Sequence, residues 1–208
     1  AESTVGLAFT PLQRGACIDR LQRDTFSHSG SAIAAKEDDS NALRFVSSGL
    51  PLPGHQIRVV DPAGHELPER QEGRLEFRGP SSTSGYYRDA EKTQILFDEE
   101  WLDTGDLAYI ANGELYVTGR IKDIIIRAGR NIYPDELEKV VGNVPGIRKG
   151  CVAVFASMDQ KTQTEKLVVM AETRSDDPDE HHTLRSEINT LSVDLTGIPP
   201  DEIVLAPP

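Results

Sequence analysis

Short apolar runs, several of them alternating with polar residues, recur along the first half of the chain and predict strands. Segment 56–79 holds two such runs around a turn rich in proline, glycine and charged residues. Segment 89–97 follows a helical spacing and predicts a short helix. Residues 1–41 contain no long periodic segment, and their polar runs, such as 23–31, predict loops and short strands.

The pair Asn112-Gly113 marks a hairpin, because both residues tolerate positive φ. The strands that this hairpin joins are predicted at 107–110 and 114–118. Segment 122–129 predicts a further strand, which is unusual in placing three isoleucines directly after charged residues.

Residues 134–144 follow a helical pattern. Pro134 suits the first helical position, and the acidic residues after it favour the positive end of the helix dipole. An apolar stripe follows at Leu137, Val140, Val141 and Val144. Beyond this helix we expect strands at 149–156 and 165–173, an acidic loop at 174–182, a helix at 184–195 and a last strand at 201–206.

These elements predict an α+β fold in which a β-rich first part is followed by a compact α+β second part, with the boundary near Lys122. The chain has 208 residues, which is enough for one large domain or two small ones. No internal repeat is visible.

Net charge limits the choice of partner. The chain has 22 lysines and arginines against 34 aspartates and glutamates, a balance of −12. This sign argues against nucleic acid or an anionic membrane as the main partner, although Arg120, Lys122, Arg127 and Arg130 form a local basic cluster. No apolar segment approaches the ~20 residues of a membrane span, and no signal peptide is visible, so a cytoplasmic location is expected.

The two cysteines, Cys17 and Cys151, lie far apart without metal-ligand spacing. A disulfide between them is an alternative that we do not favour. Cys151 begins an apolar run and is interpreted as a small, buried strand residue.

Asp106 is the first candidate for binding chemistry. A carboxylate at the edge of a strand can accept two hydrogen bonds from the vicinal diol of a ribose, or it can simply cap a turn. Arg120 offers planar donors that suit phosphate or ribose oxygens, and its alternative role is a surface salt bridge. The same alternative holds for Lys122 and Asp123.

Other polar features are weaker. Gly129 lies between two arginines, but the chain contains neither a GxGxxG nor a GxxxxGK[ST] signature. The hydroxyl-rich segment 80–85 could contact phosphate or be an ordinary loop. His181 and His182 are expected to be solvated, and Trp101 is expected to pack rather than to contact substrate.

Two stretches, "GRLEFRGPSSTSGYY" and "WLDTGDLAYIANGELYVTGRIKDIIIRAGRNIYPDELE", together resemble the adenylate-forming acyl-activating superfamily. This group includes acyl-CoA synthetases, fatty-acyl-AMP ligases, luciferases and peptide-synthetase adenylation domains. The resemblance runs from Gly49 to Arg174 and includes "TGD", "GRxKD" and "GxxxxPxxxE" in the family's order. It implies that 1–120 is the β-rich, distorted barrel-like end of the large adenylation domain, and that 121–208 is a small mobile C-terminal domain, truncated here.

The resemblance also implies roles for single residues. Asp106 is similar to the aspartate that binds both ribose hydroxyls of ATP and of the acyl-adenylate. Arg120 resembles the arginine that contacts the ribose and the neighbouring phosphate. Lys122 falls on the hinge, and Gly129 on the loop that swings to the pantetheine channel. Glu2 looks like the glutamate that helps to hold Mg²⁺.

The implied reaction is the activation of a fatty acid by ATP and Mg²⁺. The carboxylate attacks the α-phosphorus and displaces pyrophosphate, and a phosphopantetheine thiol then takes the acyl group from the acyl-adenylate. Two branches of the family differ in this acceptor. The long segment Ser3–Ser47 resembles the insertion of fatty-acyl-AMP ligases, which deliver to a carrier protein, so this branch is favoured over a CoA-using acyl-CoA synthetase. The alternative is a longer surface loop without effect on the acceptor.

The family's adenylation lysine, expected in a "P-x-T-x-x-G-K" context, has no counterpart, since the last lysine is Lys166. No catalytic residue is therefore assigned within the chain, and that lysine is expected beyond Pro208. The chain lacks an initiator Met and is expected to be an inactive fragment by itself. A third reading is a binding module that recognises an adenylate or a carrier protein without turnover.

Overall fold

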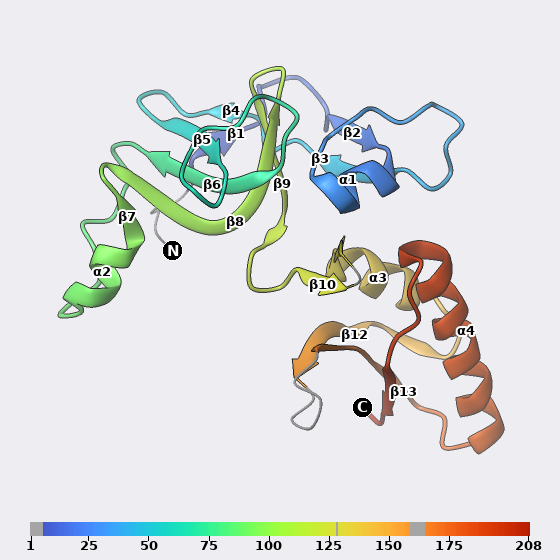
Figure 1. The fold of residues 1–208 in the computed structure, drawn as a ribbon. Coiled ribbons are helices and arrows are strands. Elements are labelled where there is room, and N and C mark those ends of the chain that lie inside the picture. Colours follow the sequence, from blue (N-terminus) through green and yellow to red (C-terminus); the bar gives the residue numbers. More distant parts are fainter. Residues whose placement is uncertain (1–5, 128, 159–164) are drawn as a thin grey trace. The chain divides into compact units, whose positions relative to one another are not determined.

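The computed structural model describes residues 6–127, 129–158 and 165–208. The chain divides into two compact units, Ala1–Lys122 and Asp123–Pro208, which are treated separately below (Figure 1). Both helices and strands are present in it, which confirms the predicted α+β class. Within the described residues, no helix is both long enough and apolar enough to cross a bilayer.

The first unit is built on a five-stranded antiparallel sheet. Its strand order is β5 (Gln56–Val60), β6 (Gly73–Arg78), β8 (Trp101–Ala111) and β7 (Phe97–Asp98), with β9 (Glu114–Arg120) also paired to β8. Figure 1 shows β8 as a long bent strand with β9 returning beside it. Two strand pairs and two helices complete the unit: β1 (Ala8–Phe9) with β4 (Leu50–Pro51), β2 (Ile18–Leu21) with β3 (Leu43–Val46), α1 (Arg23–Ser29) and α2 (Ala90–Leu96).

The predicted hairpin joins β8 to β9. Ala111 pairs with Glu114, which leaves Asn112 and Gly113 as a two-residue loop, with φ of 53° and 74°. Positive φ at both loop residues matches the twist of the flanking strands. The hairpin prediction is therefore confirmed, and it places the end of β9 beside the middle of β8.

The segment before β4 is more ordered than its sequence predicts. We expected loops at 23–31, but residues 23–29 form α1. This prediction was wrong because the helix depends on one buried contact: Phe26 is fully buried and lies near the rings of Phe45 and Tyr109, with centroids 5.4 and 5.8 Å away. Because Phe26 is the buried residue of this helix, the sequence shows no periodic apolar stripe that would predict it.

Polar contacts also fasten this segment to β8 and β9. Arg14 forms a two-pronged ion pair with Glu114, and Ser47 Oγ donates to the same carboxylate at 2.5 Å. The Tyr109 hydroxyl donates to Asp19 at 3.0 Å. Burial, followed by the nearby Asp19 charge, raises the pKa of Tyr109, so this hydroxyl remains a donor.

Acid is expected to loosen this attachment. The hydrogen bonds from Arg14, and then from Ser47, lower the pKa of the Glu114 carboxyl from its ordinary 4.5 to about 2. A depressed folded-state pKa stabilises the fold above pH 4.5, and this stabilisation is lost as the pH falls toward 2. Glu114→Gln should therefore lower the melting temperature at pH 6 and make progressively less difference between pH 4.5 and 3. Thermal unfolding at several pH values checks this. Glu66→Gln, at an exposed site, is the control. A loss of melting temperature in Glu114→Gln that stayed constant from pH 6 to pH 3 would contradict this prediction.

The second unit is a three-stranded sheet covered on one face by two helices. The sheet has the order β12 (Ile147–Met158), β13 (Glu165–Thr173), β14 (Glu202–Ala206), and the helices are α3 (Pro134–Val141) and α4 (Pro178–Thr196). β13 and β14 are parallel and are connected through α4. A hairpin of β10 (Ile125–Arg127) and β11 (Arg130–Ile132) precedes α3. The core includes Leu137, Val141, Val154, Leu167, Val169, Ala171, Leu184 and Ile188.

Two predicted segments in this unit have different bounds in the structure. The strand expected at 122–129 is confined to β10, because the chain turns back and pairs with β11. The acidic loop at 174–182 ends early, since α4 begins at Pro178, where Asp177 caps it by accepting the N–H of Asp179. His181 and His182 consequently lie on a helix, and the ring of His181 contacts the Ser175 carbonyl oxygen at 2.6 Å.

Both cysteines are free. Cys151 lies in β12 as predicted, but it is only half-buried. Cys17 lies 3.5 Å from the Tyr116 hydroxyl, measured from its sulfur. Trp101 packs as expected: the guanidinium groups of Arg58 and Arg78 lie 4.5 and 4.6 Å from its ring centroid.

Candidate functional site

Two of the predicted site residues meet where β8 and β9 pair. Asp106 is the strand partner of Arg120, and Arg120 Nε lies 3.3 Å from Asp106 Oδ1. Arg120 is largely exposed, with 71% of its side chain accessible, so water screens the pair and its contribution to stability is small. The arrangement instead presents a carboxylate acceptor and a guanidinium donor side by side, as a ligand with hydroxyl and anionic groups requires.

The turn before Asp106 is held by its own side chains. Gly105 has a φ of 74°, a conformation that favours glycine. Its N–H donates to Asp103 Oδ1 at 2.7 Å. Thr104 Oγ1 accepts the N–H of Asp106 at 3.1 Å and donates to the carbonyl of Leu75, also at 3.1 Å. The position of Asp106 is therefore set by hydrogen bonds within the turn and to β6.

A groove of about 370 Å³ opens beside this turn, entirely within the first unit. One wall comes from α2 and is partly apolar, and the other comes from the turn and the end of β9. The lining residues are Tyr86, Lys92, Ile95, Leu96, Asp103, Thr104, Gly105, Arg120 and Lys122. Two lysines and an arginine suit an anionic group, and the apolar wall suits a flat or aliphatic one.

The remaining predicted residues have different outcomes. Lys122 is exposed in a turn and is the last residue of the first unit. Gly129 is exposed, with a φ of 75°, between β10 and β11. Arg127, from the predicted basic cluster, is committed to the second unit, where it pairs with Asp201 at 2.6 Å. Glu2 lies outside the described residues.

The groove also contains residues that sequence reasoning missed. Asp103 and Thr104 directly precede Gly105, so the same motif could have indicated them. Tyr86 lies in the first of the two quoted stretches but was given no role, and Lys92 carries no comparable signal, because it reaches the groove only through the fold of α2.

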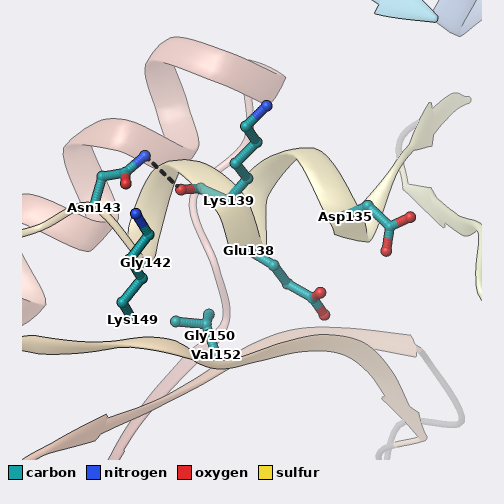
Figure 2. Close-up of a pocket in the computed structure, with 8 residues that line it drawn as sticks. All are labelled: Asp135, Glu138, Lys139, Gly142, Asn143, Lys149, Gly150 and Val152. Carbon is teal, nitrogen blue, oxygen red and sulfur yellow. Dashed lines mark hydrogen bonds between the residues drawn. The ribbon is translucent and has the colours of Figure 1, made fainter. Parts of the chain in front are cut away.

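A second groove, of about 460 Å³, lies in the other unit between α3 and β12 (Figure 2). Its rim carries Lys139, Lys149 and Asp135. Glu138 also lines it and accepts the backbone N–H of Val154 at 2.8 Å, which satisfies part of the edge of β12. None of the predicted site residues lines this groove, so the groove beside Asp106 is the candidate site.

No family model matches the chain, but individual relatives do. A protein of Caulobacter vibrioides, provisionally named an acyl-CoA synthetase, is 37% identical over 193 residues, which are 92% of this chain and 33% of that protein. The 2-succinylbenzoate–CoA ligase of Enterococcus faecalis is 37% identical over 136 residues, 65% of this chain and 28% of the ligase. A solved structure from a study of fatty acyl-adenylate ligases of E. coli and L. pneumophila has a TM-score of 0.88 at 32% identity, covering 100% of this chain and 36% of that one.

These similarities confirm the resemblance predicted from the motifs. The chain belongs to the adenylate-forming enzymes, together with acyl-CoA synthetases, fatty acyl-AMP ligases and peptide-synthetase adenylation domains. It spans about a third of the length of the first relatives it matches, 33% and 38%.

Proposed function

We propose that this chain is part of an ATP-dependent enzyme that activates a fatty acid as its acyl-adenylate. The observation that carries the proposal is the pairing of Asp106 with Arg120 beside a groove rimmed by lysines. In the proposed reaction the Asp106 carboxylate accepts hydrogen bonds from both ribose hydroxyls, and Arg120 donates to the ribose and the nearby phosphate.

The two units have separate roles in this proposal. The unit ending at Lys122 closes the large domain that binds the nucleotide, and the unit beginning at Asp123 is the small domain that moves between half-reactions. Lys122 is the hinge between them. Gly129, in its exposed turn, belongs to the loop that reaches the pantetheine channel.

The proposed chemistry is an in-line displacement. The fatty-acid carboxylate attacks the α-phosphorus of ATP, the bond to pyrophosphate breaks, and acyl-AMP remains bound. The chain's own contribution is to position the adenosine end, so that the reacting groups meet in a productive geometry. Glu2, the residue proposed for Mg²⁺, lies outside the described residues, and these contain no cluster of three His, Cys, Asp or Glu that could hold a metal ion. No step is therefore assigned to a metal.

We propose a carrier protein as the acceptor. The support is that the described part of the segment Ser3–Ser47 contains β2, α1 and β3, and that Arg14 and Ser47 bond to Glu114. The similarity to a fatty acyl-adenylate ligase structure over the whole chain favours the same branch. The second candidate is CoA, which the names of the CoA-ligase relatives favour.

The test uses the full-length polypeptide with ATP, Mg²⁺ and fatty acids of several lengths. Acyl-AMP and acyl-CoA are quantified separately, first with CoA and then with a phosphopantetheinylated carrier protein. We expect acyl-AMP to accumulate with CoA and to be consumed with the carrier. Acyl-CoA formed at a comparable rate would favour the second candidate, and absence of acyl-AMP with every acid would overturn the proposed activity.

A further inference from the structure

The sheet of the first unit has two very different faces. One face supplies the core, with Val59, Leu75, Phe77 and Leu102 buried. The opposite face carries charged side chains on β5, β6 and β8, and among them Glu76 has no exposed surface. A fully buried carboxylate is costly unless opposite charges and hydrogen bonds surround it, so this face needs an explanation.

Ion pairs run across the strands on this face and surround Glu76. Arg58 donates from Nε to Glu76 Oε2 at 2.7 Å and from Nη2 to Asp98 at 2.7 Å. On the other side, Arg74 Nη2 lies 3.6 Å from Glu76 Oε1, and Arg74 Nη1 donates to Asp103 Oδ2 at 3.0 Å. Negative and positive side chains therefore alternate along a row formed by Asp98, Arg58, Glu76, Arg74 and Asp103.

The row ends at the candidate site. Asp103 uses its two oxygens differently: Oδ2 accepts from Arg74, while Oδ1 accepts the N–H of Gly105. Gly105 precedes Asp106, and its carbonyl oxygen accepts the N–H of Ile121, next to Arg120. Gly105 therefore has a hydrogen bond near each residue of the pair: its N–H, directly before Asp106, is bonded to Asp103, and its carbonyl oxygen is bonded to Ile121, directly after Arg120.

We propose that Arg74 is a positioning residue for the nucleotide site, acting through Asp103 on the turn at Gly105. The inference rests on the proposed function, since it assumes that Asp106 binds the ribose. Arg74 does not line the groove, and the side-chain bond that connects it to the turn is the one to Asp103 Oδ2.

The physical reason lies in how the Asp103 carboxylate is oriented. With Arg74 holding Oδ2, Oδ1 stays aimed at the Gly105 N–H, and a charge-assisted bond is stronger than a neutral one. Without Arg74 the carboxylate rotates more freely and is better satisfied by water. The turn then samples other conformations, and part of the ATP binding free energy is spent on restoring the productive one.

The test compares two arginines of β6 in the full-length polypeptide. Arg74→Gln should raise the KM for ATP about tenfold, the equivalent of one hydrogen bond, with kcat at saturating ATP within about twofold of the unchanged enzyme. Arg74→Lys should restore most of the affinity. Arg78→Gln is the matched control, because Arg78 lies on the same strand and pairs with Glu100 rather than Asp103, and its KM should not change.

An unchanged KM for ATP in folded Arg74→Gln, or the same rise in Arg78→Gln, would overturn the inference. Because Arg74 also faces buried Glu76, its loss could prevent folding, and Asp103 then supplies the second comparison. Asp103→Asn keeps an acceptor for the Gly105 N–H and should weaken ATP binding less than Asp103→Ala does. Equal effects of these two changes would count against the inference.

Failure of the inference and failure of the proposed function give different results. If Asp106→Ala raises the KM for ATP while Arg74→Gln does not, only the positioning role is lost. If Asp106→Ala itself has no effect, the ribose site is wrong, and the inference fails together with it.

Discussion

Replacing Asp106 by alanine in the full-length polypeptide should raise the KM for ATP at least about a hundredfold. Two hydrogen bonds between ribose hydroxyls and a carboxylate contribute roughly 3 kcal/mol together, and each 1.4 kcal/mol is a factor of ten in affinity. The fold should survive, because Asp106 is only partly buried and its partner Arg120 is exposed. Steady-state formation of pyrophosphate over a range of ATP concentrations measures the effect.

Glu66→Ala is the control for this experiment, since it removes an exposed carboxylate from the same unit away from the groove. Asp106→Asn separates geometry from charge: the amide keeps one acceptor oxygen and should give an intermediate KM. An ATP dependence in Asp106→Ala equal to that of the control would refute the ribose role.

A proline at position 122 should separate the two half-reactions. Lys122 lies in a turn where the two units divide, and proline fixes φ near −65° and restricts the preceding residue as well. We expect Lys122→Pro to keep acyl-AMP formation within about threefold, while transfer to the thiol slows more than about tenfold, because in the proposed function only the second step requires the torsion to change. Single-turnover assays of each step measure this.

Lys122→Ala is the matched control, since it removes the ammonium group and leaves the backbone free to rotate. It should slow transfer far less than the proline variant. Equal loss of both half-reactions in Lys122→Pro would show that position 122 is not a hinge, and equal loss of transfer in the two variants would assign the effect to the charge.

Local sequence signals were sufficient to predict elements that depend on the preferences of a few neighbouring residues. Asn112-Gly113 predicted the hairpin because the φ preference of two residues decides it. Pro134 and the apolar stripe that follows it predicted α3, because a helix start and an amphipathic pattern are also local features. The hairpin alone does not bring Asp106 beside Arg120: its regular register would pair Asp106 with Gly119, and an irregularity between Leu107 and Ala108 shifts the partner to Arg120.

Tertiary contacts decided the elements and sites that the pattern missed. α1 exists because Phe26 is buried beside Phe45 and Tyr109, residues remote in the chain. The place of Arg74 behind Asp103 depends on the register of β6 against β8, including the irregularity between Arg74 and Glu76.

The sequence by itself determined the family, the α+β class, the hairpin, α3 and the residues proposed for the ribose. These follow from motifs and from φ preferences, which act over a few residues. Only the tertiary structure decided that residues 7–47 are fastened to Glu114, that Lys92 and Tyr86 line the groove, and that Glu76 is a buried charge. The reason is that burial and ion pairing depend on which distant strands become neighbours, and a local pattern does not record that choice.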